Sequence, residues 1–172
     1  MRRRAIAAAL AGAAVLASGG CSSSPHVYAG LIDPCLLFVT SSAVEAAPDM
    51  AQGAVRPVDG QTSGGASQVA GCGDSFENKY HGMRTIRLTV GLYKGDEAVS
   101  RAAGYFPESG PDGPWDRASI GGGHASGQVG NVVLDVGIQD TGIGPFPPQP
   151  NDGVMTKVLA DSVDRLKTRY GG

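Results

Sequence analysis

A chain of 172 residues, 41% of them hydrophobic, is long enough for one domain with a hydrophobic core and too short to expect two. Its 27 glycines and 11 prolines predict short elements joined by many turns, at a share below that of disordered low-complexity chains. The formal net charge of −2 lacks the basic excess that nucleic-acid binding requires, so no nucleic-acid partner is expected.

The first twenty residues have the pattern of an export signal. Three arginines begin it, residues 5–17 form an apolar run, and residues 18–20 are small. The apolar run has 13 residues, fewer than the roughly 20 that a permanent membrane-spanning helix needs. We therefore expect residues 1–20 to be a removable signal peptide.

A cysteine, Cys21, directly follows the signal. This order resembles the lipobox of bacterial lipoproteins, in which the cysteine becomes the lipidated first residue of the mature chain. The resemblance implies that acyl chains such as palmitate anchor Cys21 in a membrane, each buried methylene contributing about 0.8 kcal/mol. Removal of the signal leaves 11 basic and 16 acidic residues, a formal charge of −5, so contact with anionic lipid is expected through the anchor alone.

Residues 21–30 are predicted to be a lipidated tether and residues 31–172 the folded domain. The domain should begin with a helix, because Asp33 is a favoured N-cap and Pro34 suits the first turn. Pro48 should end that helix near Ala47. Residues 50–66 are predicted to be mostly loop, with a short strand at 54–58.

Alternating apolar and polar residues predict the strands. The pattern is clearest at residues 86–92 and 129–139, and weaker at 68–77 and 118–120. A turn at residues 78–82 would make 68–77 and 86–92 antiparallel neighbours. Residues 94–103 favour a short helix with an acidic start.

The C-terminal part of the chain gives the strongest helix signal. Gly142 to Pro150 contains four prolines and should cross the surface in an extended form. Asn151 and Asp152 are then expected to cap an amphipathic helix that ends near Tyr170. Together the elements predict an α+β domain, an antiparallel sheet of about four to six strands packed against the N-terminal and C-terminal helices on one face.

Two cysteines remain after lipidation of Cys21. Cys35 and Cys72 form an even pair in an exported and therefore oxidising setting, which predicts a disulfide. Two buried free thiols are the alternative. A metal site is disfavoured because no histidine has ligand spacing from either cysteine. No metal and no cofactor is expected.

The order of these elements resembles a family of actinobacterial cell-envelope lipoproteins that carry a domain of unknown function. The resemblance rests on Asp33-Pro34-Cys35, on Cys72 and on the terminal helix after Asp152. Extracellular sensor domains of actinobacterial receptor kinases have a similar layout. The resemblance implies a lipid-anchored α+β module on the outer face of the cytoplasmic membrane. This family has no assigned activity, so it implies no catalytic residue.

Enzymatic chemistry has weak support in the sequence. His26 lies in the tether, His81 in a predicted turn, and His124 after three glycines, where a flexible hairpin tip is the favoured interpretation. No Gly-x-Ser-x-Gly elbow occurs, and Ser119 is close to His124 only in sequence. Asp135 is expected to face solvent on the open side of the sheet. We therefore expect a non-enzymatic protein, with an exported hydrolase as a remaining alternative.

Binding is the function that the pattern favours. Tyr105, Phe106 and Trp115 lie in a proline-stiffened loop that could present them to a small envelope ligand or lipid. The alternative is that these aromatics fold back over the edge of the core. A second hypothesis is a membrane-tethered module for an envelope protein partner, which would use an exposed strand edge or residues 142–150.

Overall fold

The computed structural model describes residues 26–60, 65–95, 97–104, 106–107 and 110–171. The expected signal peptide, Cys21 and Tyr105 lie outside the described residues. Among the described residues, no helix combines the length and the apolar composition that crossing a bilayer requires.

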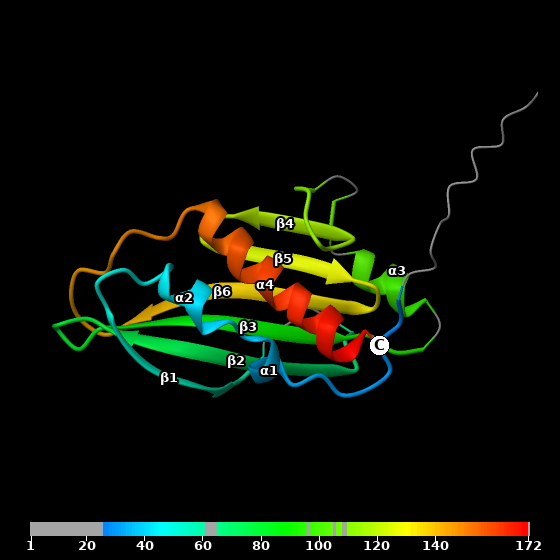
Figure 1. The fold of residues 1–172 in the computed structure, drawn as a ribbon, viewed down its shortest axis with the longest axis horizontal. Coiled ribbons are helices and arrows are strands. Elements are labelled where there is room, and N and C mark those ends of the chain that lie inside the picture. The colour runs from blue at the N-terminus through cyan, green and yellow to red at the C-terminus, as the bar shows by residue number, and fades with distance from the viewer. Residues whose placement is uncertain (1–25, 61–64, 96, 105, 108–109, 172) are drawn as a thin grey trace, which may run out of the picture.

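One antiparallel sheet of six strands forms the body of the molecule (Figure 1). Its spatial order is β1-β2-β3-β6-β5-β4, so the two central strands are those with the strongest sequence alternation. The strands are β1 (Ala51–Val58), β2 (Gln68–Glu77), β3 (Met83–Leu92), β4 (Arg117–Gly121), β5 (His124–Val129) and β6 (Val132–Thr141). With the helices described below, this confirms the predicted α+β class.

Three helices cover one face of the sheet, which we call the helix face (Figure 1). They are α1 (Pro34–Leu37), α2 (Thr40–Val44) and α4 (Asp152–Tyr170). Alternate residues of the central strands point into this layer, and Leu88, Leu134 and Val136 are completely buried there. The helix α3 (Ala98–Ala103) packs at one end of the opposite face, the open face, where it covers Val133.

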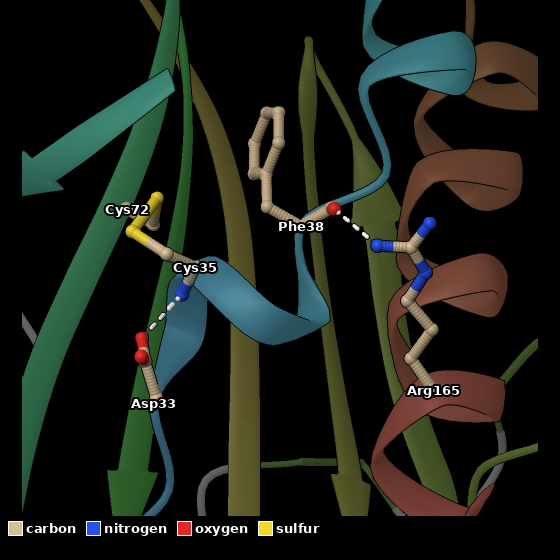
Figure 2. Close-up of a disulfide and its surroundings, with 5 residues drawn as sticks. All are labelled: Asp33, Cys35, Phe38, Cys72 and Arg165. Atoms are coloured by element: carbon tan, nitrogen blue, oxygen red, sulfur yellow. Dashed lines mark hydrogen bonds between the residues drawn. A yellow bond between two sulfur atoms is a disulfide. The ribbon is translucent and has the colours of Figure 1, made fainter. Parts of the chain in front are cut away.

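The predicted first helix is broken into two short ones. Phe38 and Val39 between them have extended backbone torsions. The carbonyl oxygen of Phe38 accepts a hydrogen bond of 2.7 Å from Nη1 of Arg165 on α4 (Figure 2). A continuous helix would need that oxygen for its own backbone, and β-branched Val39 and Thr40 favour helix weakly.

The start of α1 follows the expectation from its motif. Asp33 caps the helix by accepting a hydrogen bond of 2.9 Å from the backbone amide of Cys35, and Pro34 is the first helical residue. Cys35 forms a disulfide with Cys72 on β2, which fastens α1 to the sheet (Figure 2). The predicted disulfide is therefore present.

One strand of the sheet differs from the prediction. Residues 129–139 do not form a single strand, because Gly130 and Asn131 turn the chain between β5 and β6. The sequence prediction missed β5, whose residues are mostly small and give little alternation. Small size is what the packing requires, because a Cβ added at Gly127 would lie 3.2 Å from Cδ2 of Leu159 on α4. The remaining strands and the 78–82 turn match their predictions to within a few residues, except that β1 begins at Ala51.

Packed structure begins before residue 31, the predicted start of the domain. Tyr28 is only 4% exposed. The buried side chain of Asn131 binds both backbone groups of Tyr28, at 2.7 Å to its amide and 3.0 Å to its oxygen. These bonds tie Tyr28, a residue of the predicted tether, to the β5–β6 turn.

Candidate functional site

The open face of the sheet carries a row of residues aligned by strand register. Arg87 on β3 pairs with Gly137 on β6. The β5–β6 register places His124 on the other side of Gly137, and His124 pairs with Gly121 on β4. In this row a glycine therefore separates two side chains that can carry positive charge. The missing side chain at Gly137 leaves a depression between them.

That depression is a hollow of about 360 Å³. Its volume is within the range of about 300 to 1,000 Å³ that is usual for small-molecule sites. The residues around it come from the three strands β3, β5 and β6, and most are polar: Arg87, Thr89, His124, Asp135, Gly137, Ile138 and Gln139. We call this the open-face hollow and treat it as the candidate site.

A hydrogen-bonded trio forms one wall of the open-face hollow. Nε2 of His124 lies 2.9 Å from Oδ1 of Asp135. The hydroxyl of Ser126 donates to the other carboxylate oxygen of Asp135 at 3.1 Å and lies 3.4 Å from Nδ1 of His124. Asp135 thus orients the imidazole ring through one carboxylate oxygen, and its other oxygen accepts the hydrogen bond from Ser126.

The trio contains the residue types of a serine hydrolase, so its geometry bears on that alternative. A hydroxyl has a single proton to donate. The shorter contact of Ser126 runs to Asp135, and its distance to the imidazole is at the limit of a hydrogen bond. The serine hydroxyl therefore donates its proton to the carboxylate of Asp135. A nucleophilic serine would instead donate it to the histidine that acts as its base, so this geometry does not activate Ser126.

The pKa of His124 is raised above its ordinary value, chiefly by the hydrogen bond to Asp135 and against a lowering by partial burial. A raised pKa means that the folded state holds the proton more tightly than the unfolded state. The stability from this pair is therefore fully present below the unfolded pKa of about 6.5 and is lost as pH rises through the folded pKa.

Replacing Asp135 by asparagine should consequently destabilise the protein more at pH 6 than at pH 8.5. The His124 side chain is 52% exposed, so solvent screening limits the difference to less than about 1 kcal/mol. Urea unfolding at the two pH values measures it. In a His124→Gln background the same substitution should show no such pH dependence. An equal effect at both pH values with His124 present would mean that the pair does not form.

Another buried carboxyl lies on the helix face, near the disulfide. Asp74 is completely buried, and burial raises its pKa, while the hydrogen bond from Gln52 Nε2, 2.7 Å from Oδ2, lowers it. Its second oxygen has no hydrogen-bond partner among the described residues. Because the Asp74 side chain has no contact with solvent, a ligand cannot reach it, and we do not treat it as a binding site.

The two predicted aromatic contacts that the structure describes, Phe106 and Trp115, lie in different clusters. Phe106 is 8% exposed and packs in the cluster under α3, whereas Trp115 is 9% exposed and packs in the main core. The indole Nε1 of Trp115 donates to the carbonyl of Pro111 at 2.7 Å. A hollow of about 220 Å³ lies beside Trp115 in its own loop. Both described aromatics thus lie at the edges of the core, and Trp115 also lines this hollow.

Another hollow, of about 380 Å³, lies at the end of the sheet away from α3. The turn between β2 and β3 and the proline segment around Phe146 line it, together with Pro48, Asp49 and Met50. It is more apolar than the open-face hollow. Its described charged groups, Asp49 and Lys79, form no ion pair there. We therefore place the candidate site on the open face.

Sequence reasoning considered His124 and Asp135 singly and missed their pairing. The available signal was their register. With a two-residue turn at Gly130 and Asn131, Ser126 lies opposite Asp135, and alternate residues face the same side. That signal depended on recognising β5 as a strand.

The protein is thus of the α+β class, with helices packed on one face of an antiparallel sheet and a polar hollow on the other. Comparisons with protein-family models, with curated proteins and with solved structures find no match for this chain.

Proposed function

We propose that the protein is a lipid-anchored, extracytoplasmic lipoprotein of the cell envelope, on the outer face of the cytoplasmic membrane, and that it binds a small envelope ligand without catalysing a reaction. The ligand site is the open-face hollow. The observation that carries this proposal is the convergence of Arg87, His124, Asp135 and Gln139 around a hollow floored by Gly137.

The anchoring part of the proposal is supported by the signal pattern before Cys21 and by the short distance from Cys21 to packed structure. Tyr28, seven residues later, is already buried. Seven residues span at most about 25 Å even when fully extended. The folded domain would therefore sit close to the membrane surface.

Replacing Cys21 by serine is expected to release the protein from the membrane, because the acyl chains have no other attachment point. The measurement is the fraction of protein in the membrane pellet of producing cells, together with mass spectrometry of the native N-terminal peptide. Cys35→Ser is the matched control, since it removes a cysteine without touching the anchor. Retention of the Cys21→Ser chain in the pellet after a salt and carbonate wash would contradict lipid anchoring.

Replacing Gly137 by valine is expected to weaken ligand binding at least about tenfold by filling the floor of the hollow. The strand should tolerate this change. The nearest atom to an added Cβ is Cδ2 of His124 at 3.4 Å, and β-branched residues suit strands. The measurement is a thermal-shift and calorimetric screen of the mature lipoprotein, in non-ionic detergent, against soluble envelope glycans and short-chain lipids.

Gly121→Val on β4 is the control for this screen, because an added Cβ there meets nothing within 4 Å. A compound that binds the native protein and the Gly137→Val variant equally well would place the site elsewhere.

A second candidate function, a module that docks an envelope protein, is favoured by the β1 edge of the sheet. Residues Ala51 to Pro57 are all exposed, and Val55 is 40% exposed. An unpaired edge strand can add a partner strand by backbone hydrogen bonding. Cross-linking in intact cells tests this idea, with Val55→Lys as the variant. A cross-linked partner lost in Val55→Lys but retained in Gly137→Val would favour docking over ligand binding.

A further inference from the structure

We propose that the open-face hollow binds a small anion, a carboxylate, sulfate or phosphate group, between the guanidinium of Arg87 and the protonated ring of His124. This inference rests on the proposed binding function and specifies the class of ligand. It follows from the hydrogen-bond capacity of Arg87, from the charge balance around Asp135 and from the space above Gly137.

Arg87 has unused binding capacity. A guanidinium offers five N–H donors, and among the described residues Arg87 makes a single side-chain hydrogen bond, from Nη2 to Oε1 of Gln139. No described carboxylate lies within ion-pair distance of it. Its buried Nε has no partner among the described residues. A half-buried cation with free donors is what planar or tetrahedral oxyanions recognise.

The carboxylate of Asp135 interacts with His124 and Ser126 and not with Arg87. Its two carboxylate oxygens contact His124 and Ser126. When His124 is protonated, the ion pair is neutral and Arg87 leaves the hollow with a net positive charge. When His124 is neutral, Asp135 offsets Arg87 and the net charge is zero. The attraction for an anion therefore depends on the protonation of His124.

The spacing suits a small group. Arg87 and His124 are on strands separated by β6, so their backbones are about 10 Å apart, two strand spacings. Both side chains rise from the sheet on either side of Gly137, which has no side chain to block the space. An oxyanion above Gly137 can thus accept hydrogen bonds from the free donors of Arg87 and face the imidazolium.

Other charged groups near His124 are few among the described residues. The neighbouring strand β6 contributes Asp135, and β3 beyond it contributes Arg87. On the other side, β4 presents Gly121 and Ser119, which carry no charge, and Arg117 lies at the far end of that strand. The hydrogen bond to Asp135 raises the pKa of His124, so the ring holds its proton to a higher pH than a free histidine does. Anion binding should therefore strengthen as pH falls.

Calorimetric titration of the mature lipoprotein in non-ionic detergent tests the inference, with sodium sulfate and sodium lactate as probes at pH 5.5 and pH 8. Both anions keep their charge across this range, so only the protein titrates. We expect saturable binding of one or both at pH 5.5, weakened about fivefold or more at pH 8. A third arm with a soluble short-chain phosphatidylglycerol distinguishes a lipid headgroup from a free anion.

Four variants separate specific from general electrostatic binding. Arg87→Met should weaken binding at pH 5.5 at least about tenfold, and Arg87→Lys should restore part of it. His124→Gln should remove the pH dependence. Arg56→Met, which removes an exposed arginine from β1, should leave binding unchanged. Far-ultraviolet circular dichroism checks that each variant is folded.

No saturable binding of any probe at pH 5.5, or binding that Arg56→Met weakens as much as Arg87→Met does, would overturn the inference. Persistence of the pH dependence in His124→Gln would overturn the part played by His124. The broader binding proposal can hold where this inference fails. If a neutral glycan binds and Gly137→Val blocks it while the anions do not bind, the hollow is a ligand site of another class.

Discussion

Replacing Arg84 by methionine is expected to lower the free energy of unfolding by about 3 to 5 kcal/mol, as removal of one partner from a buried ion pair usually does. Arg84 is completely buried. It binds both carboxylate oxygens of Asp140 at 2.8 Å and donates to the carbonyls of Ala46, Pro147 and Pro148 at 2.7 to 3.2 Å. Methionine keeps much of the volume but leaves these acceptors without their donor.

The reason for so large an effect is that Arg84 holds three other parts of the chain together. It holds the end of β6, the chain after α2 and the proline-rich segment that leads into α4. Proline has no backbone N–H, so segment 142–150 has few donors of its own and depends on a partner that supplies them. We expect Arg84→Met to loosen the packing of segment 142–150 as well as to lower the stability of the whole domain.

Urea unfolding of the native protein and of four variants measures the effect. Arg56→Met and Arg87→Met are the controls, since neither arginine has an ion pair among the described residues, and each should cost less than about 1 kcal/mol. Arg84→Met with Asp140→Leu should recover only part of the loss, because the three carbonyl oxygens stay unpaired. A loss below about 1 kcal/mol for Arg84→Met alone would show that this network is not formed.

Replacing both Cys35 and Cys72 by alanine is expected to lower the free energy of unfolding by about 4 kcal/mol, the chain-entropy estimate for their loop. The disulfide joins residues 37 positions apart and is the covalent link between α1 and the sheet. The loss arises mainly because the unfolded chain regains freedom that the loop had removed.

Ligand binding at a temperature where the double variant is folded should be unchanged, because the disulfide lies on the helix face and the hollow on the open face. Reduction of the native protein should reproduce the stability loss, which is the matched control. A variant that keeps its unfolding midpoint but loses binding would show that the cysteines belong to the binding site instead of serving as a fastening.

The elements that sequence predicted well are those whose signal is local. Helix α4 has 19 residues with one apolar stripe and an Asn151 cap that accepts from the amide of Val154 at 3.0 Å. β3 and much of β6 alternate over most of their length. In each case one face of the element is buried, so apolar residues repeat with the period of the helix or strand and predict it directly.

The features that sequence did not predict depend on contacts between distant residues. The break after α1 follows from a hydrogen bond between Phe38 and Arg165, 127 residues apart. The hollow follows from the register that brings His124 beside Asp135. Arg84 and Arg87 have similar neighbours in sequence, yet one is sealed on the helix face and the other lines the open-face hollow. Successive residues of β3 point to opposite faces of the sheet, so Arg84 and Arg87, three positions apart, point to different faces. Only the fold shows which of the two faces is covered by the helices.

The measurement that tests the central claim most directly uses the three histidines as reporters in one nuclear magnetic resonance titration. His124 lines the open-face hollow, His26 makes an edge-to-face contact with the ring of Tyr28, and His81 pairs with Glu77 near the β2–β3 turn. The mature lipoprotein is titrated with sulfate, lactate and the envelope glycans while the imidazole proton signals are followed. We predict a saturable shift of the His124 signal with the signals of His26 and His81 unmoved. A compound that binds saturably and leaves His124 unmoved, or no saturable shift with any compound, would contradict the open-face hollow as the ligand site.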